Sequence, residues 1–263
     1  MKTVLITGAS SGIGYELARV YAENGHNLVV VARRREKLED LKKEIEKNIS
    51  DKVMVTVIKK DLAKKNAPRE LFDEIKKKNI YVDILINNAG FGMYGKFSEL
   101  TQEEMEKNSN LIDLNIKALV ELTKLYLDEF VKKDRGQILN VASTAAFLTG
   151  PLMANYYASK SYVLSFTEAL REEMKKTGIK ICTLCPGPTL TEFEKSSNAD
   201  KKGLFSSLKL MTAEKVARKA YKDFEKGENI IIPGILNKIL VYAIKILPGK
   251  LLTFISMKIQ ETK

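Results

Sequence analysis

The chain alternates seven short apolar runs, rich in β-branched residues, with longer segments in which apolar residues recur at helical spacing. The runs lie at 3–7, 27–31, 52–58, 83–86, 137–141, 179–184 and 229–232. Because each run is continuous rather than alternating, we expect strands that are buried on both faces and joined by helical crossovers. The sequence therefore predicts an α/β fold, a doubly wound parallel sheet of about seven strands.

Length and composition favour one domain over two. The 263 residues are 44% hydrophobic and 29% charged, which suits one large soluble core. No low-complexity tract, flexible linker or internal repeat divides them. We therefore expect one domain at 1–233 and a C-terminal extension at 234–263.

Charge, histidine and cysteine content argue against several classes of function. The net charge is +11, but the lysines are interleaved with acidic residues and accompany no nucleic-acid-binding motif, so we expect no nucleic-acid partner. The lone His26 supports neither a metal cluster nor a Ser-His-Asp triad, so we expect no metal. Cys182 and Cys185 lie three apart in a predicted strand and are interpreted as apolar fillers. The N-terminus has too few apolar residues for a signal peptide, which predicts a cytoplasmic protein.

A glycine-rich turn follows the first predicted strand and opens the first predicted helix. It reads Thr7-Gly8-Ala9-Ser10-Ser11-Gly12-Ile13-Gly14. Glycines allow a sharp turn and a close approach of the backbone to pyrophosphate, while the helix N-terminus supplies amide donors. The flanking strand and helix favour a dinucleotide-binding (Rossmann) turn over a plain βα turn.

The end of the second predicted strand indicates which dinucleotide is bound. NAD sites place an acidic residue here for the ribose 2′-hydroxyl, whereas NADP sites place a basic one for the 2′-phosphate. This chain has Arg33, Arg34 and Arg35, with no acid before Glu36. Guanidinium binds phosphate bidentately, so we predict NADP(H), held first by Arg33 and then by Arg34. The alternative, that an arginine merely decorates a helix start, applies best to Arg35 and less to Arg34.

A tyrosine and a lysine stand four residues apart in the run Tyr156-Tyr157-Ala158-Ser159-Lys160. On a helix, Tyr156 and Lys160 share one face, and a nearby ammonium lowers the pKa of a phenol toward the range of proton exchange. In a chain with 44 lysines and arginines this spacing also arises by chance, as an exposed helix turn. Its meaning therefore depends on the other motifs.

Together these motifs resemble the short-chain dehydrogenase/reductase family, from residue 3 to about 233. The markers occur in family order: TGASSGIG at 7–14, Asp61-Leu62, Asn87-Asn88-Ala89-Gly90, Asn115 in LNIKA, Ser143, YYASK at 156–160, and Pro186-Gly187 with Thr191. The resemblance implies a Rossmann-fold oxidoreductase of the ketoacyl- or carbonyl-reductase kind, active as a homodimer or homotetramer.

The resemblance also implies catalytic roles for four residues. Tyr156, rather than Tyr157, is then the general acid in carbonyl reduction, because only Tyr156 lies four before Lys160. Lys160 lowers the tyrosine pKa and binds the nicotinamide ribose, and Ser143 donates to the carbonyl oxygen. Asn115 holds a water in a proton relay, or satisfies backbone groups in a helix kink; these two roles are compatible.

The implied cofactor contacts extend along the chain. Asp61 binds the adenine amino group and Leu62 lends an amide, while Asn87 ties strands together. The remaining contacts are Gly8, Ser10, Ser11, Gly12, Ile13, Gly14, Arg33, Arg34, Asn88, Ala89, Gly90, Tyr156, Lys160, Pro186, Gly187, Thr189 and Thr191. Thr191 would hold the carboxamide, and for Thr189 a simple turn role is equally open.

Apolar residues near these motifs predict a hydrophobic carbonyl substrate. They occur at 91–95, after the Asn-Asn-Ala-Gly turn, and at 145–148, after Ser143. The segment 192–210, with Leu204, Phe205, Leu208 and Leu210, corresponds to a substrate lid in the family. Apolar lids also shield small substrates, so the substrate itself is not identified.

The extension at 234–263 combines many isoleucines and leucines with five lysines and one glutamate. Neither apolar piece reaches the roughly 20 residues of a membrane span. Such a basic amphipathic hairpin can lie on an anionic membrane surface, form a lid or subunit contact, or simply pack on the core.

The sequence thus predicts an NADPH-dependent reductase that converts a ketone, hydrophobic or acyl-linked, to a secondary alcohol. The alternative is a dinucleotide-binding regulator or scaffold with the same fold and no turnover. The presence of Asn115, Ser143, Tyr156 and Lys160 favours the enzyme, because a pure binding protein needs no such set.

Overall fold

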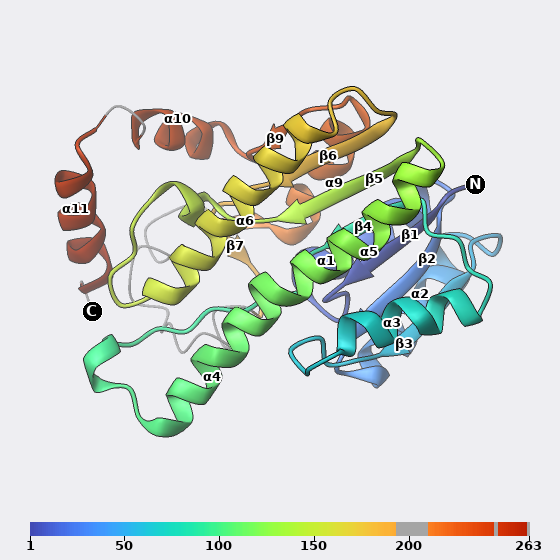
Figure 1. The fold of residues 1–263 in the computed structure, drawn as a ribbon, viewed down its shortest axis with the longest axis horizontal. Helices are drawn as coiled ribbons and strands as arrows, with labels where there is room; N and C mark the ends of the chain where they lie inside the picture. Colours follow the sequence, from blue (N-terminus) through green and yellow to red (C-terminus); the bar gives the residue numbers. More distant parts are fainter. Residues whose placement is uncertain (193–209, 245–246, 262–263) are drawn as a thin grey trace.

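A parallel seven-stranded sheet forms the centre of the molecule in a computed structural model, which describes residues 1–192, 210–244 and 247–261. The strand order is β3-β2-β1-β4-β5-β6-β9. The strands are β1 (Thr3–Thr7), β2 (Asn27–Ala32), β3 (Val55–Lys59), β4 (Ile84–Asn87), β5 (Gly136–Val141), β6 (Ile179–Leu184) and β9 (Ile230–Ile231). The predicted α/β doubly wound fold is therefore confirmed (Figure 1).

Helices cover both faces of this sheet. The helices are α1 (Gly12–Glu23), α2 (Arg35–Asn48), α3 (Ala67–Lys77), α4 (Gln102–Ile112), α5 (Leu119–Lys132), α6 (Ala154–Glu173), α9 (Ala213–Glu225), α10 (Ile235–Ile244) and α11 (Gly249–Glu261). The chain also contains two short 3-10 helices and one π-helical segment. These are η1 (Phe97–Glu99), η3 (Thr144–Phe147) and the π-helical η2 (Asp113–Ala118).

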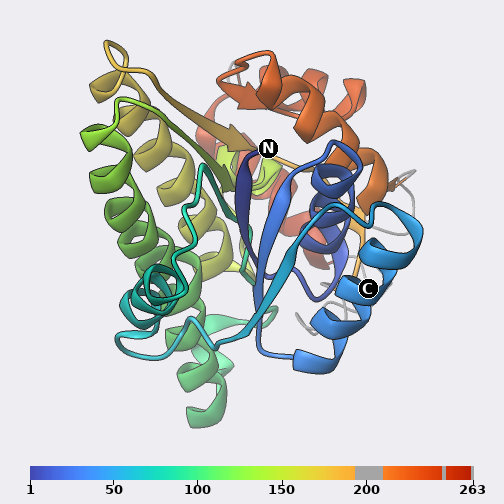
Figure 2. The same cartoon turned by 90° about the vertical axis from the view of Figure 1, so that its right-hand side faces the viewer.

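Alternate residues of each strand explain the two helical layers. Val4 and Ile6 of β1 pack with α1, α2 and α9, whereas Leu5 between them packs with α3, α5 and α6. Figure 2 shows these two layers on opposite sides of the sheet. Because helices cover both faces of the sheet, residues on both sides of a strand are mostly buried, which explains the continuous apolar runs.

The strand order reverses between β1 and β4, which are neighbours in the sheet although Ile84 lies 77 positions after Thr7. In open α/β sheets, ligands bind at the carboxyl edge beside such a switch point, and we call this region of the molecule the crevice. The glycine-rich turn after β1 and the Asn88-Ala89-Gly90 segment after β4 flank this crevice.

Several boundaries differ from the sequence-based expectation. Strand β3 begins at Val55 rather than residue 52, because pairing with β2 starts at Leu28 opposite Val55. Strand β9 has two residues rather than four, since only Thr183 and Leu184 of β6 pair with it. The two-residue strands β7 (Thr189–Leu190) and β8 (Met211–Thr212), which pair with each other, were not predicted.

The predicted helical extension consists of α10 and α11. Val241 of α10 is buried in a cluster with Leu119, Ala142, Val163 and Ile232. Within the described ranges, no helix combines the length and apolar character needed to cross a bilayer.

Candidate active site

The crevice at the carboxyl edge is lined by two segments in close contact. A Cβ atom at Gly8, where φ is +70°, would lie 2.8 Å from Ala89 Cα, and one at Gly14 would lie 2.4 Å from Asn88 Nδ2. Asn88 Nδ2 donates to the carbonyl oxygen of Thr7 at 2.9 Å. Glycine is therefore required here for packing between the two loops, in addition to any approach of a phosphate.

The N-terminus of α1 has no side-chain cap. Ser11 is the N-cap residue, but its side chain makes no capping hydrogen bond. It instead accepts a hydrogen bond from Arg34 Nη2 at 2.8 Å, and Ser10 Oγ accepts one from the same atom at 3.1 Å. Uncapped amides at a helix N-terminus favour negative charge, and Gly12 and Ile13 begin this helix.

Arg34 also joins the glycine-rich turn to the segment after β7. Its Nη1 lies 2.7 Å from Glu192 Oε2, and both side chains are about half exposed. The hydrogen bond from Arg34 is the main reason that the pKa of Glu192 lies below its usual value. Arg34 is therefore more than a decoration of the α2 start: it already binds a carboxylate at the rim of the crevice.

Arg33 faces a different space. It lines an open cavity of about 450 Å³ together with Asp61, Lys59, Lys60, Lys64, Ala67 and Glu70. One oxygen of the Asp61 carboxylate accepts a hydrogen bond from the Ala63 amide at 3.2 Å. The side chain of Leu62 is buried in the core. The three lysines were not among the predicted site residues; they line the same cavity as Asp61, and Lys60 pairs with Glu70 at 3.2 Å.

Tyr156, Lys160 and Ser143 come together at the ends of two elements. Tyr156 and Lys160 stand one turn apart on α6, with Lys160 Nζ 5.8 Å from the centre of the Tyr156 ring. Ser143 follows β5 as the N-cap of η3, and its side chain is a hydrogen-bond partner of the Tyr156 hydroxyl. The phenol of Tyr156, a potential proton donor, and the hydroxyl of Ser143 therefore lie side by side.

The pKa values of this group are governed by burial. Desolvation raises the pKa of Tyr156 to about 12, and the hydrogen bond with Ser143 offsets only part of that rise. Desolvation also lowers the pKa of Lys160 to about 8. The expected lowering of the tyrosine pKa by Lys160 is absent from this structure, where the ammonium donates to the Val141 carbonyl oxygen at 3.0 Å.

Asn115 lies in the π-helical segment η2 and is 1% exposed. Its Oδ1 accepts from the Phe91 amide at 3.1 Å, and its Nδ2 donates to the Phe91 carbonyl oxygen and to Ser159 Oγ. Ser159 Oγ in turn donates to the Tyr156 carbonyl oxygen at 2.7 Å. Asn115 therefore satisfies backbone groups, as one of its two expected roles required, and connects the loop after β4 with α6.

Asn87, by contrast, lies below the crevice inside the core. Its Nδ2 donates to Asn140 Oδ1 at 2.9 Å and to Thr123 Oγ1 at 3.0 Å. Asn87 and Asn140 are register partners in β4 and β5. These contacts agree with the expectation that Asn87 ties neighbouring strands together.

The Pro186-Gly187 turn closes the crevice on the β6 side. The Pro186 carbonyl oxygen accepts from Ser143 Oγ at 3.4 Å, and Thr189 Oγ1 donates to the Gly187 carbonyl oxygen at 2.8 Å. A Cβ at Gly12 would lie 3.1 Å from the Thr191 methyl carbon. Thr191 is therefore adjacent to the glycine-rich turn, and the hydroxyl of Thr189 stabilises its own turn.

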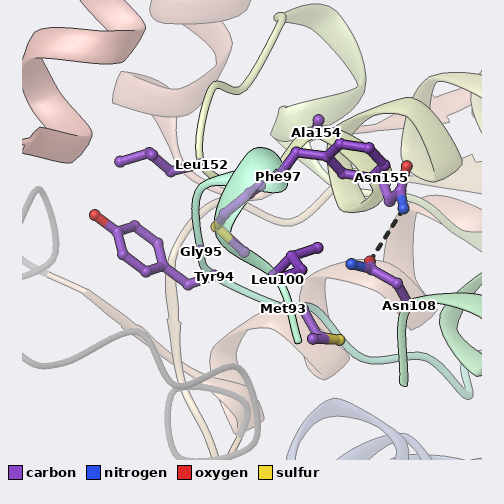
Figure 3. Close-up of a pocket in the computed structure, with 10 residues that line it drawn as sticks. Met93, Tyr94, Gly95, Phe97, Leu100, Asn108, Leu152, Ala154 and Asn155 are labelled. Atoms are coloured by element: carbon purple, nitrogen blue, oxygen red, sulfur yellow. Dashed lines mark hydrogen bonds between the residues drawn. The ribbon is translucent and has the colours of Figure 1, made fainter. Parts of the chain in front are cut away.

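Apolar side chains gather beside the start of α6, as Figure 3 shows. Met93, Tyr94, Leu100, Leu152 and Asn155 are among the residues around a cavity of about 30 Å³, room for little more than a water molecule. Leu152 was not predicted; its φ of +64° lets its carbonyl oxygen accept from the Gly95 amide at 2.8 Å.

Parts of the expected substrate pocket are buried or lie outside the described residues. Ala145 and Ala146 are buried, and Ala146 belongs to a core cluster with Ala142 and Val163. Of the expected lid at 192–210, Leu204, Phe205 and Leu208 lie outside the described residues.

Known proteins share this fold and these motifs. The family described as short chain dehydrogenase matches residues 2–202. The NADP-dependent 3-hydroxy acid dehydrogenase YdfG of Salmonella typhi is 31% identical over 184 residues, covering 70% of this chain and 71% of that protein.

Two solved structures are also similar. A short-chain dehydrogenase from Sphingobium yanoikuyae in complex with NADPH superimposes with a TM-score of 0.81 and 29% identity, covering 94% of this chain and 97% of that one. The bulky-bulky ketone specific alcohol dehydrogenase from Comamonas testosteroni gives a TM-score of 0.76 and 27% identity, covering 94% and 95%. The chain belongs to the short-chain dehydrogenase/reductase family, a family of oxidoreductases.

Proposed function

We propose that this protein is an NADPH-dependent carbonyl reductase that converts a hydrophobic ketone to a secondary alcohol. The observation that carries the proposal is the hydrogen-bonded pair of Tyr156 and Ser143, with Lys160 one turn further along α6. This group stands at the carboxyl edge of the sheet, where ligands bind in open α/β folds.

The crevice residues fit NADP(H). The uncapped N-terminus of α1 suits a pyrophosphate, and Arg33 and Arg34 suit a 2′-phosphate. Arg34 already holds the Glu192 carboxylate, so its guanidinium is oriented to bind an anion. Similar proteins support this choice, since one was solved with NADPH and another is named NADP-dependent. Asp61, Leu62, Asn88, Ala89, Gly90 and Thr191 would complete the contacts.

The chain's own residues would perform the acid catalysis, and the bound cofactor would supply the hydride. Ser143 donates to the carbonyl oxygen and holds it beside the Tyr156 hydroxyl. Tyr156 gives its proton to that oxygen as negative charge develops there. A phenol with a pKa of about 12 is fully protonated at neutral pH, so it is ready to act as an acid.

Lys160 and Asn115 would support this step. A protonated Lys160 would bind the ribose hydroxyls of the cofactor. Asn115 positions α6 through Ser159, and its role in a water relay remains part of the proposal.

The proposed substrate class rests on side chains beside the start of α6. Met93, Tyr94 and Leu152 are apolar or largely so, and they line a small cavity together with Ala154 and Asn155 of α6. Similar proteins include enzymes named for bulky ketones and for 3-hydroxy acids. We therefore propose a hydrophobic or acyl-linked ketone.

NADPH and NADH oxidation with aliphatic, aromatic, ketoacyl and steroid ketones tests the proposal. We expect turnover of at least one ketone class, with NADPH preferred. Tight NADPH binding with no turnover of any class would contradict it and favour the regulator or scaffold. We also propose that residues 1–233 form the cofactor-binding and catalytic domain and that residues 234–263 are an extension of it.

Lys160 makes NADPH binding depend on pH. Because its pKa in the free protein is about 8, the ammonium that would bind the ribose is lost as pH rises above that value. We expect the Kd for NADPH to rise, by up to about tenfold per pH unit, between about pH 8 and 9.5. Titration of NADPH fluorescence measures this. Tyr156→Phe should keep the dependence and Lys160→Met should lack it; a wild-type Kd that stayed constant would refute the assignment.

Glu192 competes with the cofactor for Arg34. Replacing it by glutamine removes a charged partner that a 2′-phosphate must displace, so the affinity for NADPH should rise about two- to fivefold. Isothermal titration with NADPH measures the change, and NADH should respond less. Glu172→Gln, which removes another exposed ion pair, with Lys175, is the matched control. Unchanged or weaker NADPH binding in Glu192→Gln would count against the competition.

A further inference from the structure

The two C-terminal helices expose an unusually apolar surface. Its residues, which we call the C-terminal surface, have exposed fractions between 42% and 78%: Ile235, Leu236, Ile239, Leu240, Tyr242, Leu247, Leu251 and Phe254. Half of the sixteen exposed large hydrophobic residues in the described part of the chain are thus gathered in two helices and their connection. Scattered exposed apolar residues are normal, whereas a contiguous group marks a site of interaction.

The pattern along α10 shows that this exposure is one-sided. Val241 is buried in the core, and Asn237, one turn earlier, contacts the Gly187 turn. Ile235, Ile239 and Tyr242 follow each other at helical spacing on the opposite side and are exposed. The helix therefore packs by a narrow stripe and presents a broad apolar face outward.

The charges around this surface are mostly positive. From residue 234 to the end of α11 the sequence contains lysines at 238, 245, 250 and 258 and one glutamate, at 261. Lys238 and Lys250 are exposed, and Lys258 Nζ lies 4.9 Å from the ring centre of Phe254. Apolar side chains bordered mainly by lysines form an interfacial amphipathic surface.

We infer that the C-terminal surface docks on an anionic lipid bilayer. A second copy of the chain is a poorer occupant, because a two-fold interface would bring four lysines of each copy together with only one glutamate per copy to compensate them. Anionic headgroups provide that compensation, and acyl chains accept the apolar side chains. Since no described helix is long enough to cross the membrane, α10 and α11 would lie in its surface.

This docking would bring the crevice to the membrane. The hydroxyls of Thr149 and Thr253 lie 2.6 Å apart, which connects α11 with the segment between Ser143 and Tyr156. Figure 1 shows α10 and α11 on the side toward which β5 points, the carboxyl edge of the sheet. A lipid-dissolved ketone would then reach the catalytic group from the bilayer side.

Vesicle co-sedimentation of the full chain tests the inference. We expect pelleting with phosphatidylcholine vesicles that contain about one third phosphatidylglycerol, little pelleting with phosphatidylcholine alone, and release at high salt. Ile235→Gln/Ile239→Gln should lower the partition coefficient at least tenfold, and Lys238→Gln/Lys250→Gln roughly tenfold.

Matched variants on other faces complete the design. Met54→Gln/Val131→Gln removes two exposed apolar residues, and Lys124→Gln/Lys132→Gln two exposed lysines; both should pellet as wild type. Equal binding of all variants, or none by the wild type, overturns the inference. Sedimentation velocity without lipid reveals the rival outcome, in which Ile235→Gln/Ile239→Gln dissociates an oligomer. The assay involves no NADPH, so its failure leaves the reductase proposal untouched.

Discussion

Replacing Tyr156 with phenylalanine should lower kcat for ketone reduction by about 10²- to 10⁴-fold, because the substituted ring has no proton to give to the carbonyl oxygen. The Kd for NADPH should change little, since Lys160 and the arginines are untouched. Single-turnover NADPH oxidation at saturating ketone measures the chemical step directly.

Tyr157 provides the matched control for this variant. Its ring packs against Gly150, where a Cβ would lie 2.2 Å from a ring carbon. Tyr157→Phe keeps this packing and removes only the hydroxyl, so kcat should stay within about twofold of wild type if Tyr156 alone is the acid. If kcat fell equally in Tyr156→Phe and Tyr157→Phe, Tyr156 would not be the specific proton donor. The loss would then come from disturbed packing rather than from proton transfer.

Removing two guanidinium groups should reverse the cofactor preference. Arg33→Ala/Arg34→Ala is expected to raise the Kd for NADPH about 100-fold while the Kd for NADH changes little, because charge-assisted hydrogen bonds to phosphate are lost. Parallel titrations with both cofactors measure the ratio. The single variants then show how much each arginine contributes to NADPH affinity. Arg33 lines the large cavity, whereas Arg34 must first release Glu192.

Arg35→Ala is the internal control for the arginine cluster. Arg35 lies on α2 and pairs with Glu39 four residues later, at 3.3 Å. It carries the same charge as its two neighbours, but its partner is Glu39 on its own helix. If Arg35→Ala weakened NADPH as much as the double variant does, general positive potential rather than phosphate contact would explain the preference.

The sequence predicted what depends on local pattern. The predicted runs at 3–7 and 179–184 have the same bounds as β1 and β6. Apolar, β-branched stretches that end at polar residues are typical of buried strands. The strands β7 and β8 are too short to leave a periodic pattern. The π-helical segment contains Asn115, whose side chain forms hydrogen bonds with Phe91, a residue 24 positions away.

The site was predicted less completely than the fold, because its details arise from contacts between distant segments. Arg34 and Glu192 are separated by 158 positions. Burial in the folded protein raises the pKa of Tyr156. The four-residue spacing to Lys160 predicts the opposite shift, because spacing carries no information about burial. The left-handed backbone at Leu152 has no side-chain signal, since leucine rarely adopts it.

The contact between Gly187 and Asn237 constrains how this chain can evolve. A Cβ at position 187 would lie 2.5 Å from the Asn237 amide, whose Nδ2 also donates to the Pro233 carbonyl oxygen at 2.7 Å. A side chain at position 187 therefore requires a smaller residue than asparagine at position 237. We expect the two positions to covary in any homologue that packs a helix against this turn.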